Sequence, residues 1–310
     1  NKRYLGVYLR GLAMGAADVV PGVSGGTVAF ITGIYEELLN SIKSINPQAL
    51  AILFKQGPAA FWAYINGTFL LALGLGIITS IVSLARFISL ALETQPLLVW
   101  SFFFGLILAS SWHMAKQVKR WRCQTVAALI LGAVIAYTVA ELKPSELPPQ
   151  LGLVFLSGCV AICAMILPGI SGSFILLLLG MYSHVLGAIK SFDWLLLATF
   201  AAGCGVGLLS FSHLLSWLLT RFHDTAMTLL TGFLLGSLYL IWPWKQPLTF
   251  YANSKGQQLV LTQQNILPSD YLERVGQSPE TMLCAFLMTL GIISVLFLEK
   301  FGEKSNKFLE

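Results

Sequence analysis

Ten long apolar segments follow one another along the chain, and short stretches that carry most of the charged residues separate them. A helix needs about 20 mostly apolar residues to cross the hydrocarbon core of a bilayer. The pattern therefore predicts an all-α polytopic membrane protein. The predicted segments lie at about 4–20, 22–45, 66–92, 97–115, 123–141, 151–167, 169–190, 194–220, 225–243 and 281–299.

The composition agrees with a chain that meets lipid rather than water over most of its surface. Hydrophobic residues make up 56% of the 310 residues and charged residues only 11%, whereas a soluble domain carries about 25% charged residues. The net charge of +5 comes from dispersed lysines and arginines, so we expect no nucleic-acid partner. Cys159 and Cys163 stand at helical spacing, but no second Cys or His pair completes a metal site. We therefore expect neither a metal nor a cofactor.

An internal repeat is the strongest feature of the sequence. The segment Pro21-Gly-Val-Ser-Gly-Gly-Thr27 is echoed by Pro168-Gly-Ile-Ser-Gly-Ser-Phe174, and at the same offset Gly33-Ile-Tyr35 is echoed by Gly180-Met-Tyr182. We therefore divide the chain into a first repeat at 1–143 and a second repeat at 144–310. The second repeat contains an outer loop at about 244–280.

In each repeat the first two apolar segments meet at a Pro-Gly pair, which ends one helix and lets another begin at an angle. Because the segments on either side are short or interrupted, we interpret each pair as a re-entrant helical hairpin. The hairpins lie at about 4–45 and about 151–190. Three transmembrane helices remain in each repeat, and this odd number makes the second repeat inverted relative to the first.

Lysines and arginines are distributed unequally between the two sides of this topology. Thirteen lie on the side of the N-terminus and five on the other side, while Arg86 lies within a predicted helix. Cytoplasmic loops carry the excess of positive charge in membrane proteins. We therefore expect both termini in the cytoplasm and the protein in the bacterial cytoplasmic (inner) membrane.

The two Pro-Gly breaks carry the residues that are best suited to bind an anion. After each break a helix begins, and the first turn of a helix has free N–H donors and the positive end of the helix dipole. Glycines let an anion approach this backbone, and hydroxyl groups add donors. The plainer interpretation is that these small residues only permit close helix packing, but their occurrence after both breaks favours binding. The predicted phosphate-binding residues are Ser24, Gly25, Gly26, Thr27, Ser171, Gly172 and Ser173.

Charged side chains inside apolar segments are functional candidates by default. Arg86 would supply the counter-charge to a phosphate, unless it extends to the outer interface. His213 occupies a similar position in the second repeat. Asp18 would pair with Arg86, cap the hairpin helix or take up a proton. Glu36 and Glu37 are either a solvated pair on the cytoplasmic side or part of a proton route.

An intramembrane hydrolase is a competing interpretation. Both Gly22-Val-Ser24-Gly25 and Gly169-Ile-Ser171-Gly172 fit a Gly-x-Ser-Gly pattern like that of rhomboid proteases. A serine hydrolase needs one nucleophilic serine and a partner His, whereas two equivalent serines suit a binding site. We therefore expect no enzyme and no catalytic residue.

Several longer motifs extend the comparison to nearly the whole chain, and together they resemble the PopT-type polyprenyl-phosphate transporter family, a membrane family formerly of unknown function. The motifs that carry the resemblance are Gly15-Ala-Ala-Asp18-Val-Val-Pro21-Gly-Val-Ser-Gly-Gly-Thr27, Gly33-Ile-Tyr35-Glu36, Leu167-Pro-Gly-Ile-Ser-Gly-Ser173, Phe103-Phe-Gly-Leu-Ile-Leu108 and Trp242-Pro-Trp244.

This resemblance implies a flippase that returns undecaprenyl phosphate from the outer to the inner leaflet for the synthesis of peptidoglycan and other cell-envelope precursors. Alternating access between the inverted repeats would provide the mechanism. The implied partners are the polyprenyl phosphate, the membrane lipids and a coupling ion, with the proton as one candidate; homo-oligomerisation stays open. The alternative is an ion-coupled transporter or a channel for a small soluble anion on the same scaffold.

Overall fold

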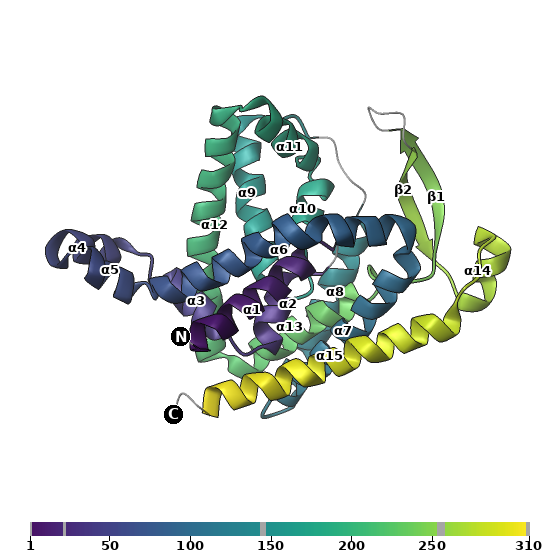
Figure 1. Ribbon diagram of the computed structural model, residues 1–310, viewed down its shortest axis with the longest axis horizontal. Coiled ribbons are helices and arrows are strands. Elements are labelled where there is room, and N and C mark those ends of the chain that lie inside the picture. The colour runs from purple at the N-terminus through teal and green to yellow at the C-terminus, as the bar shows by residue number, and fades with distance from the viewer. Residues whose placement is uncertain (1, 21–22, 143–146, 253–257, 308–310) are drawn as a thin grey trace.

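The computed structural model describes residues 2–20, 23–142, 147–252 and 258–307, and its described part is almost entirely helical (Figure 1). The first half contains α1 (Lys2–Asp18), α2 (Gly25–Ile31), α3 (Tyr35–Lys43), α4 (Pro47–Gln56), α5 (Pro58–Tyr64), α6 (Gly67–Thr94), α7 (Pro96–Lys116) and α8 (Cys123–Glu141). The second half contains α9 (Leu151–Ile166), α10 (Gly172–Leu178), α11 (Tyr182–Ser191), α12 (Trp194–Arg221), α13 (His223–Ser237), β1 (Lys245–Ala252), β2 (Gln258–Asn265), α14 (Pro268–Val275) and α15 (Thr281–Lys307).

Among the described residues, five helices are long and apolar enough to cross a bilayer, namely α6, α7, α8, α12 and α15. The bent pair α10 and α11 would be a sixth if it counted as one span, and its two helices meet at 101°. The protein is therefore a multi-pass membrane protein, as the hydrophobic pattern predicts.

Each hairpin breaks once more than the apolar pattern indicates. The predicted segment 22–45 divides at Gly33 into α2 and α3, and the segment 169–190 divides at Gly180 into α10 and α11. Both glycines adopt a left-handed backbone, with φ of 72° and 69°. This conformation ends a helix and is readily accessible only to glycine, and an apolar pattern alone does not reveal it.

Two other elements differ from the expected crossings. Helix α13 ends at Ser237 instead of continuing to about 243, because the chain tightens there and Leu240 N donates to Ser237 O over 3.0 Å. The outer loop folds into an antiparallel hairpin of β1 and β2, followed by α14. A buried cluster packs this subdomain against the beginnings of α7 and α15. Its members are Leu97, Trp244, Ile266, Tyr271 and Cys284.

Four helix pairs are packed closely: α1 with α6, α9 with α12, α7 with α15, and α8 with α13. A Cβ atom on any of the glycines at these crossings would collide with a backbone carbonyl of the neighbouring helix, and small residues are what permit such approach in membranes. The glycines are Gly11 and Gly76, Gly158 and Gly203, Gly105 and Gly291, and Gly132 and Gly232.

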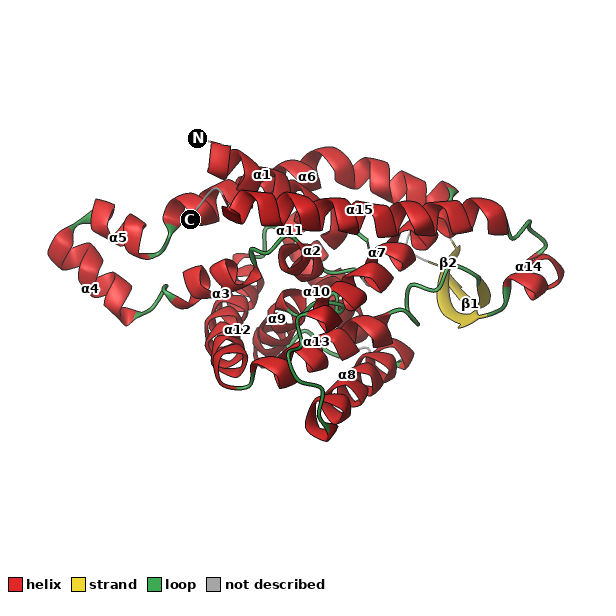
Figure 2. Ribbon diagram, turned by 90° about the horizontal axis from the view of Figure 1, so that it is seen from below, coloured by secondary structure: helices red, strands yellow, loops and turns green. Residues whose placement is uncertain are grey.

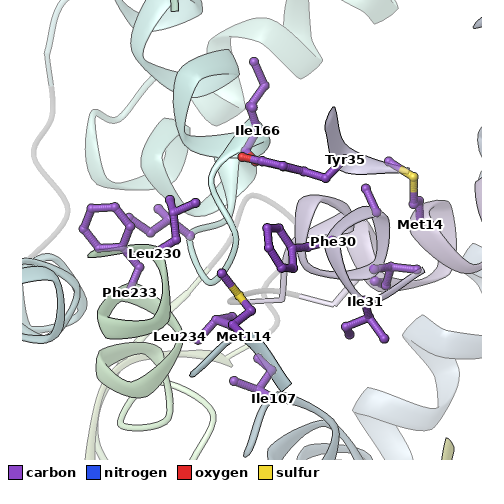
Figure 3. Close-up of a cluster of buried hydrophobic side chains, with 14 of the residues drawn as sticks. Met14, Phe30, Ile31, Tyr35, Ile107, Met114, Ile166, Leu230, Phe233 and Leu234 are labelled. Carbon is purple, nitrogen blue, oxygen red and sulfur yellow. The ribbon is translucent and has the colours of Figure 1, made fainter. Parts of the chain in front are cut away.

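The arrangement has two distinct ends. The beginning of α1 and the end of α15 lie near each other, whereas the β-hairpin lies at the opposite end (Figures 1 and 2). Between these ends a continuous apolar core joins the first hairpin to α7 and α13, with Phe30, Met114 and Leu234 among its members (Figure 3). This core surrounds the place where the two hairpins meet.

Candidate functional site

Hydrogen bonds join the two hairpins at their tips. Ser24 Oγ, at the start of α2, donates to the backbone carbonyl of Met165 over 3.0 Å. The hydroxyl of Tyr35 donates to the carbonyl of Ile166, also over 3.0 Å, and points at it in Figure 3. Because α9 ends at Ile166, its last carbonyls have no partner within their own helix. The first hairpin therefore satisfies the end of α9.

Thr27 makes a third contact between the tips. Its Oγ1 accepts a hydrogen bond from the backbone N–H of Gly169 over 3.1 Å. Gly169 has a φ of 86° and follows Pro168 in the second break. The first predicted break, at Pro21 and Gly22, lies outside the described residues. Irregular backbone within a membrane is stable only where its polar groups are paired, and Thr27 provides this pairing.

The start of α2 already holds a carboxylate. Asp18 Oδ1 accepts a hydrogen bond from Gly25 N over 2.7 Å, and Ser24 Oγ accepts one from Gly26 N over 3.1 Å. A Cβ atom on Gly25 would lie 2.6 Å from Asp18 Oδ2, and one on Gly26 would lie 2.5 Å from the carbonyl of Ile166. Of the three roles open to Asp18, the structure contains the helix cap, and close packing accounts for both glycines.

The start of α10 differs. Met165 stands where the first hairpin has Asp18, and within the described residues no side chain caps the first turn of α10. Ser171 precedes this turn, and its hydroxyl oxygen lies 2.9 Å from that of Ser173, so that one donates to the other. Gly172 packs against the carbonyl of Ala161. The positive end of the α10 dipole therefore has no carboxylate beside it.

A small cavity lies next to Ser171. Gly169, Ile170 and Phe174 line it together with residues of α8 and of the end of α13, and its volume is about 10 Å³. A cavity of this size holds about one water molecule. A phosphate would fit only after the neighbouring helices moved apart.

Arg86 and His213 lie apart from the hairpin tips. Both side chains are exposed, on α6 and α12, whereas Ser24 and Ser171 are buried. His213 Nδ1 lies 2.7 Å from the carbonyl of Leu209 in its own helix. Within the described chain no ion pair joins Asp18 to Arg86. In this conformation neither side chain supplies the counter-charge that the sequence suggests.

The two glutamates of α3 separate. Glu36 is exposed, whereas Glu37 Oε1 lies 2.6 Å from the guanidinium of Arg3 and accepts a hydrogen bond from Asn66 Nδ2 over 3.0 Å. Glu37 therefore ties α1 to α3 and to the start of α6. This contact lies at the end of the molecule where α1 begins.

Comparison with known proteins identifies the family of the chain. A family model described as undecaprenyl phosphate translocase-like matches residues 14–259, which include the tips of both hairpins. The chain belongs to this undecaprenyl phosphate translocase-like family. It is 54% identical over 301 residues to a polyprenyl-phosphate transporter of Vibrio cholerae serotype O1, with 97% of this chain and 98% of the relative covered.

A more distant relative has the same description. A polyprenyl-phosphate transporter of Staphylococcus aureus is 31% identical over 253 residues, which cover 76% of this chain and 85% of the relative. No solved structure matches the chain. The family and the names of both relatives indicate a transporter rather than an enzyme.

A lysine near the second hairpin is partly buried in this translocase-like protein. Lys245, at the start of β1, donates to the carbonyl of Leu240, and its Nζ lies 4.7 Å from the centre of the Trp100 ring. Burial lowers the pKa of Lys245 to about 8. Leu240 also lines the small cavity beside Ser171. In the sequence Lys245 falls within the predicted outer loop, and its position beside Trp242-Pro-Trp244 is the one signal that it packs among aromatic rings.

A larger cavity lies elsewhere, between α7, α8, α13 and α15. It measures about 680 Å³ and is lined mainly by apolar side chains. His113 of α7 and Glu299 of α15 form its polar part, with His113 Nδ1 3.0 Å from Glu299 Oε1. Residues 186 positions apart pair only because α7 and α15 pack together, and no local pattern predicts this.

Proposed function

We propose that this protein is a flippase that moves the phosphate head-group of undecaprenyl phosphate across the bacterial cytoplasmic membrane, from the outer to the inner leaflet. Membership of the translocase-like family and 54% identity to a polyprenyl-phosphate transporter support this proposal. The structural observation that carries it is the contact between two polar hairpin tips inside the apolar core of a multi-pass protein.

Two inverted repeats would form the scaffold. The matching glycine crossings support this: Gly11 and Gly158 stand 147 positions apart, and the carbonyls that they meet, of Leu73 and Phe200, stand 127 apart. Gly76 and Gly203 repeat the 127-residue offset. The offset shortens because α4 and α5 have no counterpart between α11 and α12. Helices α6 and α12 also have the same length of 28 residues.

We assign the end where α1 begins and α15 ends to the cytoplasm. The excess of lysine and arginine on that side supports the assignment through the positive-inside rule. The β-hairpin and α14 would then lie on the outer side.

The phosphate would bind at the start of α10, where Ser171, Gly172 and Ser173 offer hydroxyl and backbone donors. Ser24 and Thr27 hold the facing hairpin in place, and Gly25 and Gly26 allow its close approach. The free positive helix end and the nearby ammonium of Lys245 favour an anion there. Moving a phosphate through hydrocarbon without such partners is unfavourable, whereas a prenyl tail can remain in lipid.

Alternating access would open and close this site. The cavity beside Ser171 is nearly closed at about 10 Å³, whereas the cavity between α7, α8, α13 and α15 is open at about 680 Å³. From this difference in volume we infer that the structure represents a conformation in which the phosphate site beside Ser171 is closed to the outer side. Rocking of one repeat against the other would enlarge the small cavity.

Two other functions have less support. A channel for a small soluble anion would need a polar passage, whereas the large cavity is mainly apolar. A serine hydrolase would need a His beside Ser24 or Ser171. Within the described residues the recorded side-chain partners of these serines are Met165 O, Gly26 N and Ser173.

The decisive experiment measures leaflet-resolved movement of labelled polyprenyl phosphate in proteoliposomes. Replacing both hydroxyls, Ser171→Ala with Ser173→Ala, should slow transport about tenfold or more, because hydrogen bonds to a charged group contribute roughly 1.5–3 kcal/mol each. Ser191→Ala is the matched control, since its hydroxyl bonds only within α11. Absence of lipid movement by the unaltered protein, together with uptake of soluble phosphate, would refute the proposal in favour of the anion transporter.

A further inference from the structure

The geometry points to a second lipid-contact site: the cavity between α7, α8, α13 and α15 holds the prenyl chain of the carrier lipid at the cytoplasmic leaflet. This inference rests on the proposed function, but it concerns residues remote from the hairpin tips. We call this cavity the tail groove. Its volume of about 680 Å³ lies within the usual range for ligand sites, roughly 300–1,000 Å³.

The groove changes from apolar to polar along α7. Leu108 and Ala109 line its apolar part, His113 Nδ1 lies 3.0 Å from Glu299 Oε1 one turn further along, and Ala115 follows. With a rise of 1.5 Å per residue, the stretch from 108 to 115 covers about 10 Å of depth. A ligand with a hydrocarbon tail and a polar head therefore matches the groove in one orientation only.

The polar end of the groove is rich in positive charge. Trp112 and Trp121 line it; Lys116 lies 5.8 Å from the ring centre of Trp112, and Trp121 stands between Arg120 and Arg122 in the sequence. The stretch 96–122 contains no Asp or Glu, and its four basic side chains are exposed, although Asp224 of α13 accepts hydrogen bonds from the backbone N–H groups of Lys119 and Arg120 over 3.1 Å each. Paired aromatic and basic side chains are typical of the membrane interface.

This charge selects among lipids. A phosphate monoester carries about −1.5 to −2 charges at neutral pH, more than the single charge of a phosphodiester head-group. Basic side chains near the mouth therefore favour a monoester, and we infer that the groove takes a single chain. A polyprenyl phosphate has both properties, whereas a diacyl phospholipid has two chains. We commit to the prenyl phosphate as the occupant.

The pair of His113 with Glu299 has no equivalent at the positions that correspond to these residues in the internal repeat. At the 127-residue offset, His113 corresponds to Leu240. At the 159-residue offset that relates Gly132 to Gly291, Glu299 corresponds to Ala140. Both of these line the small cavity beside Ser171 instead. The corresponding crossing of α8 with α13 therefore packs without such a pair, and the polar wall of the groove is an addition to the common scaffold.

Photo-crosslinking tests the assignment. A polyprenyl phosphate with a diazirine in its first isoprene units is incorporated into proteoliposomes, and labelled peptides are identified by mass spectrometry. We expect label on the groove-lining segments of α7, α13 and α15. Leu129→Trp, which fills the groove from α8, should reduce this label at least fivefold. Ile130→Trp, whose side chain is exposed on the same helix, should leave it unchanged.

Two further arms separate the sources of failure. A phosphatidic acid with the diazirine on one acyl chain should label the groove several-fold less, and equal labelling would overturn the assignment. Neutralising the mouth with Lys116→Gln, Arg120→Gln and Arg122→Gln should lower labelling by the prenyl phosphate but not by an uncharged polyprenol, while Lys55→Gln serves as control. If the protein transports the lipid normally but the label lies outside the groove, this inference alone is refuted. If the unaltered protein does not transport the lipid, the proposed function is refuted.

Discussion

The two hairpins share nearly the same sequence at their tips but differ in what meets their short helices. The start of α2 has the carboxylate of Asp18 on Gly25 N, at 2.7 Å. The start of α10 has Met165 in that place and two hydroxyls, of Ser171 and Ser173, that bond to each other. A carboxylate satisfies a helix N-terminus and stabilises its dipole. In one copy of the repeated motif a carboxylate completes the start of the helix, whereas among the described residues no side chain does so in the other copy, where we propose that the phosphate binds.

The largest effect is expected from Gly26→Ala in the first hairpin. The new Cβ would lie 2.5 Å from the carbonyl of Ile166, so the two tips would have to separate. Overpacking of this kind destabilises by about 1–3 kcal/mol, and we expect transport to be lost as well. Thermal unfolding in detergent and the proteoliposome assay measure both effects.

Ser173→Ala is the matched control, because Ser173 holds the same position in the second hairpin and removal of its hydroxyl creates no clash. It should slow transport while the unfolding temperature stays within a degree or two of the unaltered protein. Equal destabilisation by Gly26→Ala and Ser173→Ala would break the distinction between the hairpins.

A smaller combined effect on stability and transport is expected from Thr27→Val, because it creates no clash between the hairpin tips. The substitution keeps the shape of the side chain but leaves the N–H of Gly169 without its acceptor. A buried unsatisfied donor costs about 1–3 kcal/mol. Thermal unfolding should show this loss, and amide hydrogen exchange at Gly169 should accelerate. Thr27→Ser retains the acceptor and should restore slow exchange; fast exchange in Thr27→Ser would mean that the hydroxyl is not what protects Gly169.

Much of the fold could be predicted from hydropathy alone, because a membrane helix must carry a long apolar run. The segments at 66–92, 97–115 and 123–141 became α6, α7 and α8 with small shifts at their ends. The extra breaks at Gly33 and Gly180 could not be predicted this way, since they depend on backbone dihedral angles inside apolar runs. The inverted relation of the halves remains a prediction.

The site was harder to predict because it depends on which side chains face each other. The repeated serines and glycines did identify the two segments whose tips meet, since Ser24 and Thr27 bond to residues near the second break. The exposure of Arg86 on α6 depends on helix packing, which the sequence pattern does not reveal. The pattern also left Lys245 and the pair of His113 with Glu299 unassigned, because burial and pairing of these groups arise only from helix packing.

The smallest effect on stability is expected from Asp18→Asn, and it tests what the first hairpin does besides folding. Asparagine is also a good helix cap, so its oxygen can still accept from Gly25 N, and only the charge–dipole contribution of about 0.3–1 kcal/mol is lost. If Asp18 acts solely as a cap, polyprenyl phosphate should move at nearly the rate of the unaltered protein with or without a proton gradient.

A coupling role for Asp18 would give a different result in the same proteoliposomes. Asparagine cannot bind and release a proton, so exchange of the lipid between leaflets would continue while stimulation by the gradient disappeared. Asp18→Ala provides the necessary comparison, because it removes cap and carboxylate together and should cost about 0.5–2 kcal/mol more stability than Asp18→Asn. Retention of full gradient-driven transport in Asp18→Asn would assign this carboxylate to the scaffold and leave the second hairpin as the place where ligand chemistry must be sought.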